Sequence, residues 1–210
     1  MPIARFFAIA SFAAFALMLG TPAVHAQVQW SSGIGGNDHY YQAINSPSGI
    51  SWTNANAAAV AAGGYLCTLT SQAENNFVYS LVDNPIYWQF DGFNTQGPHL
   101  GGIQVGGPEP AGGWQWVTGE AWSFTNWAAP TQPDNNGGNE NFLQFFGPGN
   151  QRANLWNDVS ASAAFSRGYV IEFNTNPSGV TAAPEPASLA LGGVGFVGMV
   201  GMIARRKAKA

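Results

Sequence analysis

The feature that most constrains the fold of this chain is a change of composition after Asn84. Before that point there are two helix signatures: an alanine-rich stretch over residues 51–62 that stops at a Gly-Gly pair, and a capping box from Ser71 to Glu74. From residue 85 to 157, glycine, proline, asparagine and tryptophan dominate. That composition suits short strands and long loops rather than helices. The order of the two regions predicts an α+β domain.

Short apolar or aromatic stretches bounded by turn residues predict the strands of this domain. We expect antiparallel strands at residues 39–44, 101–105, 114–117, 141–145 and 169–173. Leu143 and Phe145 alternate with polar or outer positions, which predicts a half-buried strand. The stretch between residues 126 and 141 is long, polar and rich in asparagine and glycine. Loops of that length are usually functional, and a bound cation would order this one.

Both ends of the chain are predicted to be targeting segments rather than parts of the fold. Residues 1–26 carry Arg5, an apolar run and a small-residue end, the order of a secretory signal peptide with cleavage before Gln27. A retained N-terminal anchor is the alternative, but the apolar run is short for a span. At the other end we expect a linker at 177–186, an apolar transmembrane segment at 187–204 and a basic cytoplasmic tail at 205–210.

The C-terminal end resembles a known sorting signal. Pro184-Glu185-Pro186, a glycine-rich apolar span and the Arg205-Arg206 pair occur in the order of the PEP-CTERM signal of Gram-negative bacteria. The resemblance implies processing by an exosortase, a membrane protease-transpeptidase, with the chain anchored in the membrane until then. It also implies a final location at the cell surface or in extracellular polysaccharide.

Residues 27–176 are expected to form one domain, and its charge is unusual. Between residues 27 and 183, Arg152 and Arg167 are the only lysine or arginine residues beside ten aspartates and glutamates. So acidic a surface repels phosphate backbones, which excludes nucleic acid as an expected partner. Cys67 is the only cysteine, so the chain forms no internal disulfide. Its apolar neighbours indicate a small buried side chain rather than a reactive thiol.

Oxygen-bearing side chains gather in the second half of this domain, although only 9% of all residues are charged. Calcium takes six to eight oxygen ligands, and carboxylates brought together without a cation repel one another. The amide side chains keep NH2 donors beside acceptor-only carboxylates, a pattern that suits a ligand with two adjacent hydroxyls. Pro133 between two of these residues is a plausible cis peptide. The predicted calcium and sugar ligands are Gln132, Asp134, Glu140, Asn157 and Asp158.

The same residues belong to a longer series of motifs that resembles a C-type lectin-like domain, over about residues 39–173. The resemblance implies a fold of two helices on short antiparallel strands with a long calcium-binding loop region. The motifs are Ser51-Trp52, Gly63-Gly64-Tyr65-Leu66, Thr70-Ser71-Gln72-Ala73-Glu74-Asn75, Gly113-Trp114-Gln115-Trp116, Thr118-Gly119-Glu120, Phe124-Thr125-Asn126-Trp127, Gln132-Pro133-Asp134, Glu140-Asn141, Trp156-Asn157-Asp158 and Tyr169-Val170-Ile171-Glu172-Phe173.

The resemblance implies that the five ligands form the principal calcium and sugar position. It further implies that the Gln-Pro-Asp order favours galactose-type sugars. Three departures qualify these expectations. Ala59, Phe142 and Ile171 stand where half-cystines are expected, so apolar packing should replace the disulfides. No tryptophan follows Gln-Pro-Asp, which predicts weak binding. An extra glycine-rich segment at 146–150 could reshape the rim of the site.

Other interpretations of the same residues were weighed. Pro133 and Asp134 could form an ordinary turn. A carboxylate pair could serve glycoside hydrolysis, but the polar loop gives no apolar pocket to raise a pKa, and no Gly-x-Ser-x-Gly or His-Glu-x-x-His motif occurs, so we expect no enzyme. A structural or protein-binding matrix protein with the same fold is the alternative to a lectin.

Three other acids and two histidines were considered as possible metal ligands. Asp91, Glu109 and Glu120 could form a second cation site, but scattered surface acids are the simpler interpretation. His39 and His99 have no metal-ligand spacing and are assigned no role. The aromatic side chains of Trp114, Trp116, Trp127 and Trp156 are expected in the core.

Overall fold

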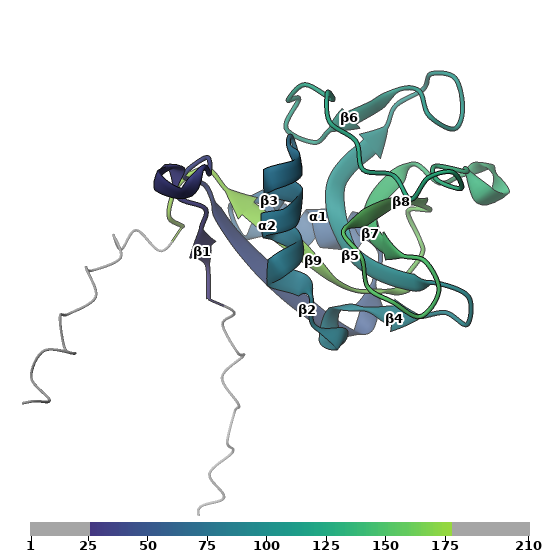
Figure 1. Cartoon of the computed structure of the whole chain (residues 1–210), viewed down its shortest axis with the longest axis horizontal. Helices are drawn as coiled ribbons and strands as arrows, with labels where there is room; N and C mark the ends of the chain where they lie inside the picture. Colours follow the sequence, from purple (N-terminus) through teal and green to yellow (C-terminus); the bar gives the residue numbers. More distant parts are fainter. Residues whose placement is uncertain (1–25, 178–210) are drawn as a thin grey trace, which may run out of the picture.

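The computed structural model describes residues 26–177 (Figure 1). The predicted signal peptide falls almost entirely outside these residues, as do the apolar segment at 187–204, the tail and nearly all of the linker. Among the described residues, no helix has the length and apolar character needed to cross a membrane. The boundaries of the domain at 27 and 176 stay predictions.

The elements occur in the predicted order, helices first and most of the sheet after them. Within residues 26–177, the α-helices are α1 (Trp52–Ala61) and α2 (Gln72–Val82), and the short 3-10 helices are η1 (Ser32–Ile34), η2 (Pro85–Tyr87) and η3 (Asn136–Gly138). The strands are β1 (Val28–Gln29), β2 (Tyr40–Ile50), β3 (Tyr65–Leu66), β4 (Gln89–Phe90), β5 (Thr95–Gln104), β6 (Trp114–Trp116), β7 (Phe142–Gly147), β8 (Leu155–Val159) and β9 (Ser166–Phe173).

The sheet runs in the order β1-β2-β9-β5-β7-β8, with β3 paired to β9 and both β4 and β6 paired to β5. The first long strand and the last one are neighbours, since Tyr40 pairs with Phe173. β5 and β9 are parallel where His99 meets Tyr169, a departure from the antiparallel expectation. Figure 1 shows the result: β1 and the end of β9 lie on the left, and β8 lies on the right.

Both predicted helices are confirmed, together with their caps. Ser51 Oγ accepts a hydrogen bond from the backbone N–H of Asn54 at the start of α1 (3.3 Å). That helix stops where Gly63 takes a φ of +83°, a left-handed conformation that glycine adopts without strain. Ser71 Oγ caps α2 through the N–H of Glu74 (3.1 Å). The Glu74 carboxylate accepts from the N–H of Thr70, one residue before the cap residue that a capping box would use.

The five predicted strands are present, but several are longer, and the two-residue strands β1, β3 and β4 as well as β8 were not predicted. β2 continues to Ile50, and β5 begins at Thr95 rather than residue 101. β8 was not predicted, so Asn157 and Asp158 lie in a strand. The half-buried description of residues 141–145 is wrong, because Gln144 is buried as well as its neighbours. The reason is the central place of β7, which pairs with β5 on one side and β8 on the other.

The core confirms the sequence-based interpretation of its unusual residues. Trp114, Trp116 and Trp156 are buried, and Trp127 is partly buried against them. Cys67 is a fully buried free thiol. Ala59, Phe142 and Ile171, at the expected half-cystine positions, all join a second hydrophobic cluster that contains Trp52. The ring centroids of Trp52 and Phe142 are 4.4 Å apart, so apolar contacts fill these places.

Candidate metal centre

Strand pairing brings together segments that are far apart in the sequence. In the β7–β8 ladder Leu143 pairs with Asp158, and Phe142 pairs with Val159. Glu140 lies just before β7, so it reaches the same end of the ladder as Asp158. The loop that carries Gln132 and Asp134 folds onto this end from the preceding part of the chain.

Three of the predicted ligands lie close to one another. One carboxylate oxygen from each of Asp134, Glu140 and Asp158 falls within 4.8 Å of the others. Asp158 is buried and Asp134 is exposed, so the group spans the depth from core to surface. Asp158 holds the loop directly. Its carboxylate accepts from the backbone N–H of Asp134 (3.1 and 3.2 Å) and of Asn135 (2.7 Å).

A tight turn positions Glu140. The backbone of Asn135 is left-handed, with φ at +47°, and the 3-10 turn η3 follows it. Glu140 Oε2 accepts from the N–H of Asn136 (2.8 Å), and the N–H of Glu140 donates to Asn135 Oδ1 (3.0 Å). Asparagine tolerates a positive φ better than most residues, which explains its place at this corner.

Each of the two predicted amide ligands precedes one of the carboxylate residues in the chain, Gln132 two positions before Asp134 and Asn157 directly before Asp158. The peptide bond between Gln132 and Pro133 is cis. Gln132 Oε1 is buried and has no hydrogen-bond partner among the described residues. Asn157 is buried next to Asp158, and its Nδ2 donates to the Asp158 carbonyl oxygen at 2.5 Å. A buried amide oxygen without a donor is costly, so the Gln132 carbonyl is suited to a cation.

The electrostatics of the cluster are unfavourable without a counter-charge. Burial, followed by the nearby Asp158 and Asp134 carboxylates, raises the pKa of Glu140 to about 7. Burial also raises the pKa of Asp158, against the lowering effect of the N–H donors from Asn135 and Asp134. The two ion pairs within residues 26–177, His39–Glu172 and Arg152–Asp83, do not involve the cluster.

This donor set fits a hard divalent cation. It offers only oxygen: three carboxylates lie within reach of one ion. Two residues before Asp134 in the chain, Gln132 adds a buried amide carbonyl that has no donor among the described residues. Carboxylate and carbonyl oxygens are the ligands that calcium prefers, and a divalent charge would offset the repulsion that raises the Glu140 pKa. Zinc or copper would call for imidazole or thiolate, and neither belongs to this group.

Two of the acids considered for a second cation site, Asp91 and Glu120, make local hydrogen bonds instead. Asp91 accepts from the backbone N–H groups of Phe93 and Asn94 in a turn (both 2.8 Å). Glu120 accepts from the hydroxyls of Thr68 and Thr118 (both 2.7 Å). Among residues 26–177, the group at Asp134 is the one set of acidic, histidine or cysteine residues spaced to hold a metal.

The glycine-rich segment at 146–150 does not reshape the rim of the cluster, so that expectation is wrong. It follows the end of β7 that pairs with Leu155, whereas Glu140 precedes the other end. There it is tied to the β4–β5 turn, because the N–H of Gly149 donates to Asn94 Oδ1 (3.1 Å). Thr95 Oγ1 also donates to the carbonyl of Gly149 (2.8 Å).

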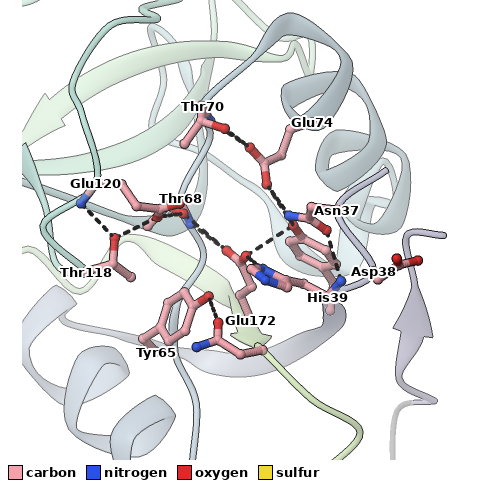
Figure 2. Close-up of polar contacts among 12 residues, drawn as sticks. Asn37, Asp38, His39, Tyr65, Thr68, Thr70, Glu74, Thr118, Glu120 and Glu172 are labelled. Atoms are coloured by element: carbon pink, nitrogen blue, oxygen red, sulfur yellow. Dashed lines mark hydrogen bonds and ion pairs between the residues drawn. The ribbon is translucent and has the colours of Figure 1, made fainter. Parts of the chain in front are cut away.

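The structure contains a second acidic cluster that the sequence did not predict, formed by Glu74 of α2 and Glu172 of β9 (Figure 2). Both carboxylates are buried, with exposed fractions of 2% and 1%. Tyr41 bridges them, since its hydroxyl lies 2.7 Å from Glu74 Oε1 and 3.2 Å from Glu172 Oε1. His39 Nδ1 lies 2.6 Å from Glu172 Oε1. The expectation that His39 has no role is therefore wrong, because it is a partner of a buried carboxylate.

Protein donors occupy the remaining oxygens of this Glu74–Glu172 network. Glu74 Oε2 accepts from the N–H and the hydroxyl of Thr70 (both 2.7 Å), and Asn37 Nδ2 donates to Glu74 Oε1 (3.0 Å). Glu172 Oε2 accepts from the N–H of Thr68 (3.0 Å). The sequence did carry one signal for it: Glu172 interrupts an apolar strand, and a buried charge requires partners.

Comparisons with known proteins support the fold and the sorting signal. Residues 182–207 match a family model described as the PEP-CTERM protein-sorting motif. The secretory phospholipase A2 receptor of Homo sapiens is 26% identical over 92 residues, which are 44% of this chain. The chain spans only 6% of the length of that receptor.

Solved structures show the same arrangement of elements. The carbohydrate-recognition domain of the mouse scavenger receptor C-type lectin superposes with a TM-score of 0.51 at 17% identity, over 74% of this chain and 98% of that one. Human lithostathine gives a TM-score of 0.50 at 19% identity, over 74% of this chain and all of the other. The fold is therefore the C-type lectin-like fold, and the predictions of this fold and of a PEP-CTERM signal are confirmed.

Proposed function

We propose that this chain is an exported, calcium-dependent carbohydrate-binding module that acts at the cell surface or in extracellular polysaccharide. One observation carries the proposal: three carboxylates converge within 4.8 Å and no cationic side chain pairs with them among the described residues. The C-type lectin-like fold and the PEP-CTERM motif support an exported, lectin-like protein in general terms.

The predicted ligands divide into two kinds in this proposal. Asp134, Glu140 and Asp158 supply negative charge to the calcium ion, and the carbonyl oxygens of Gln132 and Asn157 supply neutral ligands. Calcium would offer coordination positions to two neighbouring sugar hydroxyls. The carboxylates can accept hydrogen bonds from the same hydroxyls, and the amide NH2 groups can donate to them.

We further propose galactose-type specificity, from the Gln132-Pro133-Asp134 order, with weak affinity at a single site. The turn that follows Asp134 presents asparagines and glycines, so no aromatic ring of this turn stacks on the sugar. A millimolar dissociation constant corresponds to about −4 kcal/mol. Dense display on a surface would still retain a polymer through multivalency.

The sorting motif suggests how the module reaches that location. A PEP-CTERM signal supports processing by an exosortase-type enzyme after export, with the chain held in the membrane by the segment at 187–204 until then. The partners in this proposal are therefore a surface or matrix polysaccharide and the processing enzyme, and not nucleic acid.

A structural or protein-binding matrix protein is the second candidate. One observation favours it: the loop closes on itself, through bonds from Asp134 and Asn135 to Asp158 and between Asn135 and Glu140. A loop held in this way keeps its shape without a cation. Catalysis is not proposed, because the loop around Asp134 is polar and glycine-rich.

Calorimetric titration of the full-length chain in detergent with calcium tests the metal site, and a glycan array with and without EDTA tests the lectin. We expect saturable calcium binding and glycan retention that chelation abolishes. The Glu109→Gln variant, which removes an exposed acid outside the cluster, should behave as the parent protein. Calcium binding without glycan retention would favour the matrix protein. Absence of calcium binding would contradict the proposal of a calcium-dependent module.

A further inference from the structure

A cavity of about 470 Å³ lies at the other end of β7 and β8 from the metal centre. It opens between the end of α2, η2, β4 and the turn after β7. Figure 1 labels β4 at the lower side of the domain. The volume is in the range of small-ligand sites. Its lining combines three aromatic rings, an Asp–Arg pair and two amide side chains, none of which serves the calcium cluster.

The aromatic side forms a rigid wall with an accessible edge. Trp88 is buried, and its Nε1 donates to the carbonyl of Val82 (2.7 Å), which fixes the indole in place. The Tyr79 ring meets Trp88 edge-on, with centroids 6.1 Å apart. Phe90 also lines the cavity but is 46% exposed, so one aromatic ring is presented to solvent at the mouth.

The polar side consists of Asp83 and Arg152, with Asn150 and Gln151 beside them. Arg152 Nε donates to Asp83 Oδ1 at 2.8 Å, and the two side chains are 33% and 44% exposed, in the order Arg152 and Asp83. That bond uses one of the five donors of the guanidinium. The pair therefore presents carboxylate acceptors and guanidinium donors side by side, with no excess charge.

We propose that this cavity is a second saccharide subsite that needs no cation and takes a neutral hexopyranose unit. The C–H groups on the flat face of a pyranose carry partial positive charge and suit the negative face of an aromatic ring such as Phe90. Hydroxyls at the ring edge both donate and accept, which matches the paired carboxylate and guanidinium. A charged ligand fits less well, because Asp83 already neutralises Arg152.

This subsite goes beyond the calcium-dependent function and does not depend on it. Its lining includes Asn150 and Gln151, which lie in the connection between the end of β7 and the start of β8. The predicted calcium ligands Glu140 and Asp158 lie at the other end of this strand pair, near the start of β7 and the end of β8. A polysaccharide long enough to reach both sites would gain avidity from two weak contacts, without any new contact at either one.

The test is an NMR titration of the ¹⁵N-labelled full-length chain in detergent and excess EDTA. Methyl β-glycosides of glucose, galactose and mannose are added singly to 100 mM, and the Trp88 indole and Arg152 Nε–H signals report on the cavity. We expect at least one glycoside to shift both signals with a millimolar dissociation constant. Phe90→Ala should weaken that binding at least fivefold.

Two matched variants make the result specific. Phe93→Ala removes a ring that is 83% exposed and does not line the cavity, so it should leave binding unchanged. Asp134→Asn should also leave it unchanged, which separates this subsite from the calcium cluster. The proposal is overturned if no glycoside shifts either signal, or if Phe93→Ala weakens binding as much as Phe90→Ala.

Discussion

The two acidic clusters of this domain solve the same electrostatic problem in opposite ways. In the Glu74–Glu172 network each carboxylate oxygen has at least one protein donor, and His39 lies beside Glu172. In the metal centre the donors are backbone N–H groups of one loop, and three carboxylates face one another without a cationic side chain among the described residues.

The difference distinguishes structural acids from acids held ready for a ligand. A buried carboxylate with a full set of donors contributes to a single native arrangement, and removing it leaves those donors unpaired. Carboxylates that repel one another lower stability until a cation arrives, and the energy of binding then includes relief of that repulsion. The following predictions test this contrast, from the largest effect to the smallest.

Glu172→Ala should cause the largest loss of stability. It leaves the buried N–H of Thr68 without its acceptor and His39 without its ion-pair partner, while the Tyr41 hydroxyl keeps Glu74. We expect the free energy of unfolding in EDTA to fall by about 3 kcal/mol, measured by urea denaturation. The exposed-acid variant Glu109→Gln should change it by less than about 0.5 kcal/mol. Equal effects from the two variants would contradict the structural role of the Glu74–Glu172 network.

Asp134→Asn should weaken calcium binding without lowering the stability of the calcium-free protein. It removes an exposed carboxylate from the metal centre, so calcium affinity should fall about 100-fold by calorimetry. In EDTA the free energy of unfolding should not decrease, because one of three repelling charges is gone. Calcium at 100 times its dissociation constant should stabilise the parent by about 2.7 kcal/mol, and the variant much less at that concentration. If Asp134→Asn lowered the free energy of unfolding in EDTA as much as Glu172→Ala does, the contrast between structural and ligand-binding acids would be wrong.

The pH dependence should differ with and without calcium. The raised pKa of Glu140, about 7 against an ordinary 4.5, means that the folded, calcium-free protein binds protons more tightly than the unfolded chain. The contribution of Glu140 to the stability of the calcium-free fold is therefore fully present below about pH 4.5 and is lost as the pH rises toward 7. Calcium binding must release the proton, so affinity should fall up to about tenfold per unit below pH 7.

Glu140→Gln isolates that effect, because burial also raises the Glu172 pKa and adds a slope of the same sign. Calorimetry in buffers of different ionisation enthalpy measures the released protons. The parent should release a fraction of a proton at pH 7, and the variant less. Identical release from both proteins would assign the proton to another group.

Asn37→Ala should give the smallest effect. Asn37 Nδ2 donates to both the Tyr41 hydroxyl and Glu74 (2.8 and 3.0 Å), but Asn37 itself is exposed, so water can replace it. We expect a loss of about 1 kcal/mol in the free energy of unfolding and no change in calcium affinity. A loss as large as that of Glu172→Ala would mean that the exposed Asn37 contributes as much to the network as its buried members do.

Local chemistry explains which parts of the fold could be predicted. Helix caps at Ser51 and Ser71 are formed by residues within four positions of one another, so both helices follow from the sequence. The strand β8 could not be found in the same way, because Trp156-Asn157-Asp158 has no alternation of its own and forms a strand only through its pairing with β7. The parallel contact of His99 with Tyr169 joins residues 70 positions apart and has no local signature.

The two clusters differ in predictability for a related reason. Asp134, Glu140 and Asp158 share one chemical requirement, a hard cation, so residue type together with the C-type lectin-like series of motifs indicated that they should meet. Their convergence is present, while their role in binding stays a prediction. His39, Glu74 and Glu172 are held by different donors, one from each of several elements, and no composition rule connects them.

The placement of the first and last strands determines from which side of the domain a linker or tag leaves. β2 and β9 are neighbours, and from β9 the sheet runs through β5 and β7 to β8, a lateral distance of about 14 Å at the usual strand spacing. A linker at either terminus, whether natural or an affinity tag, therefore leaves from the side remote from Asp158. Immobilisation through either end should give sensor surfaces on which the calcium loop stays accessible to large glycans.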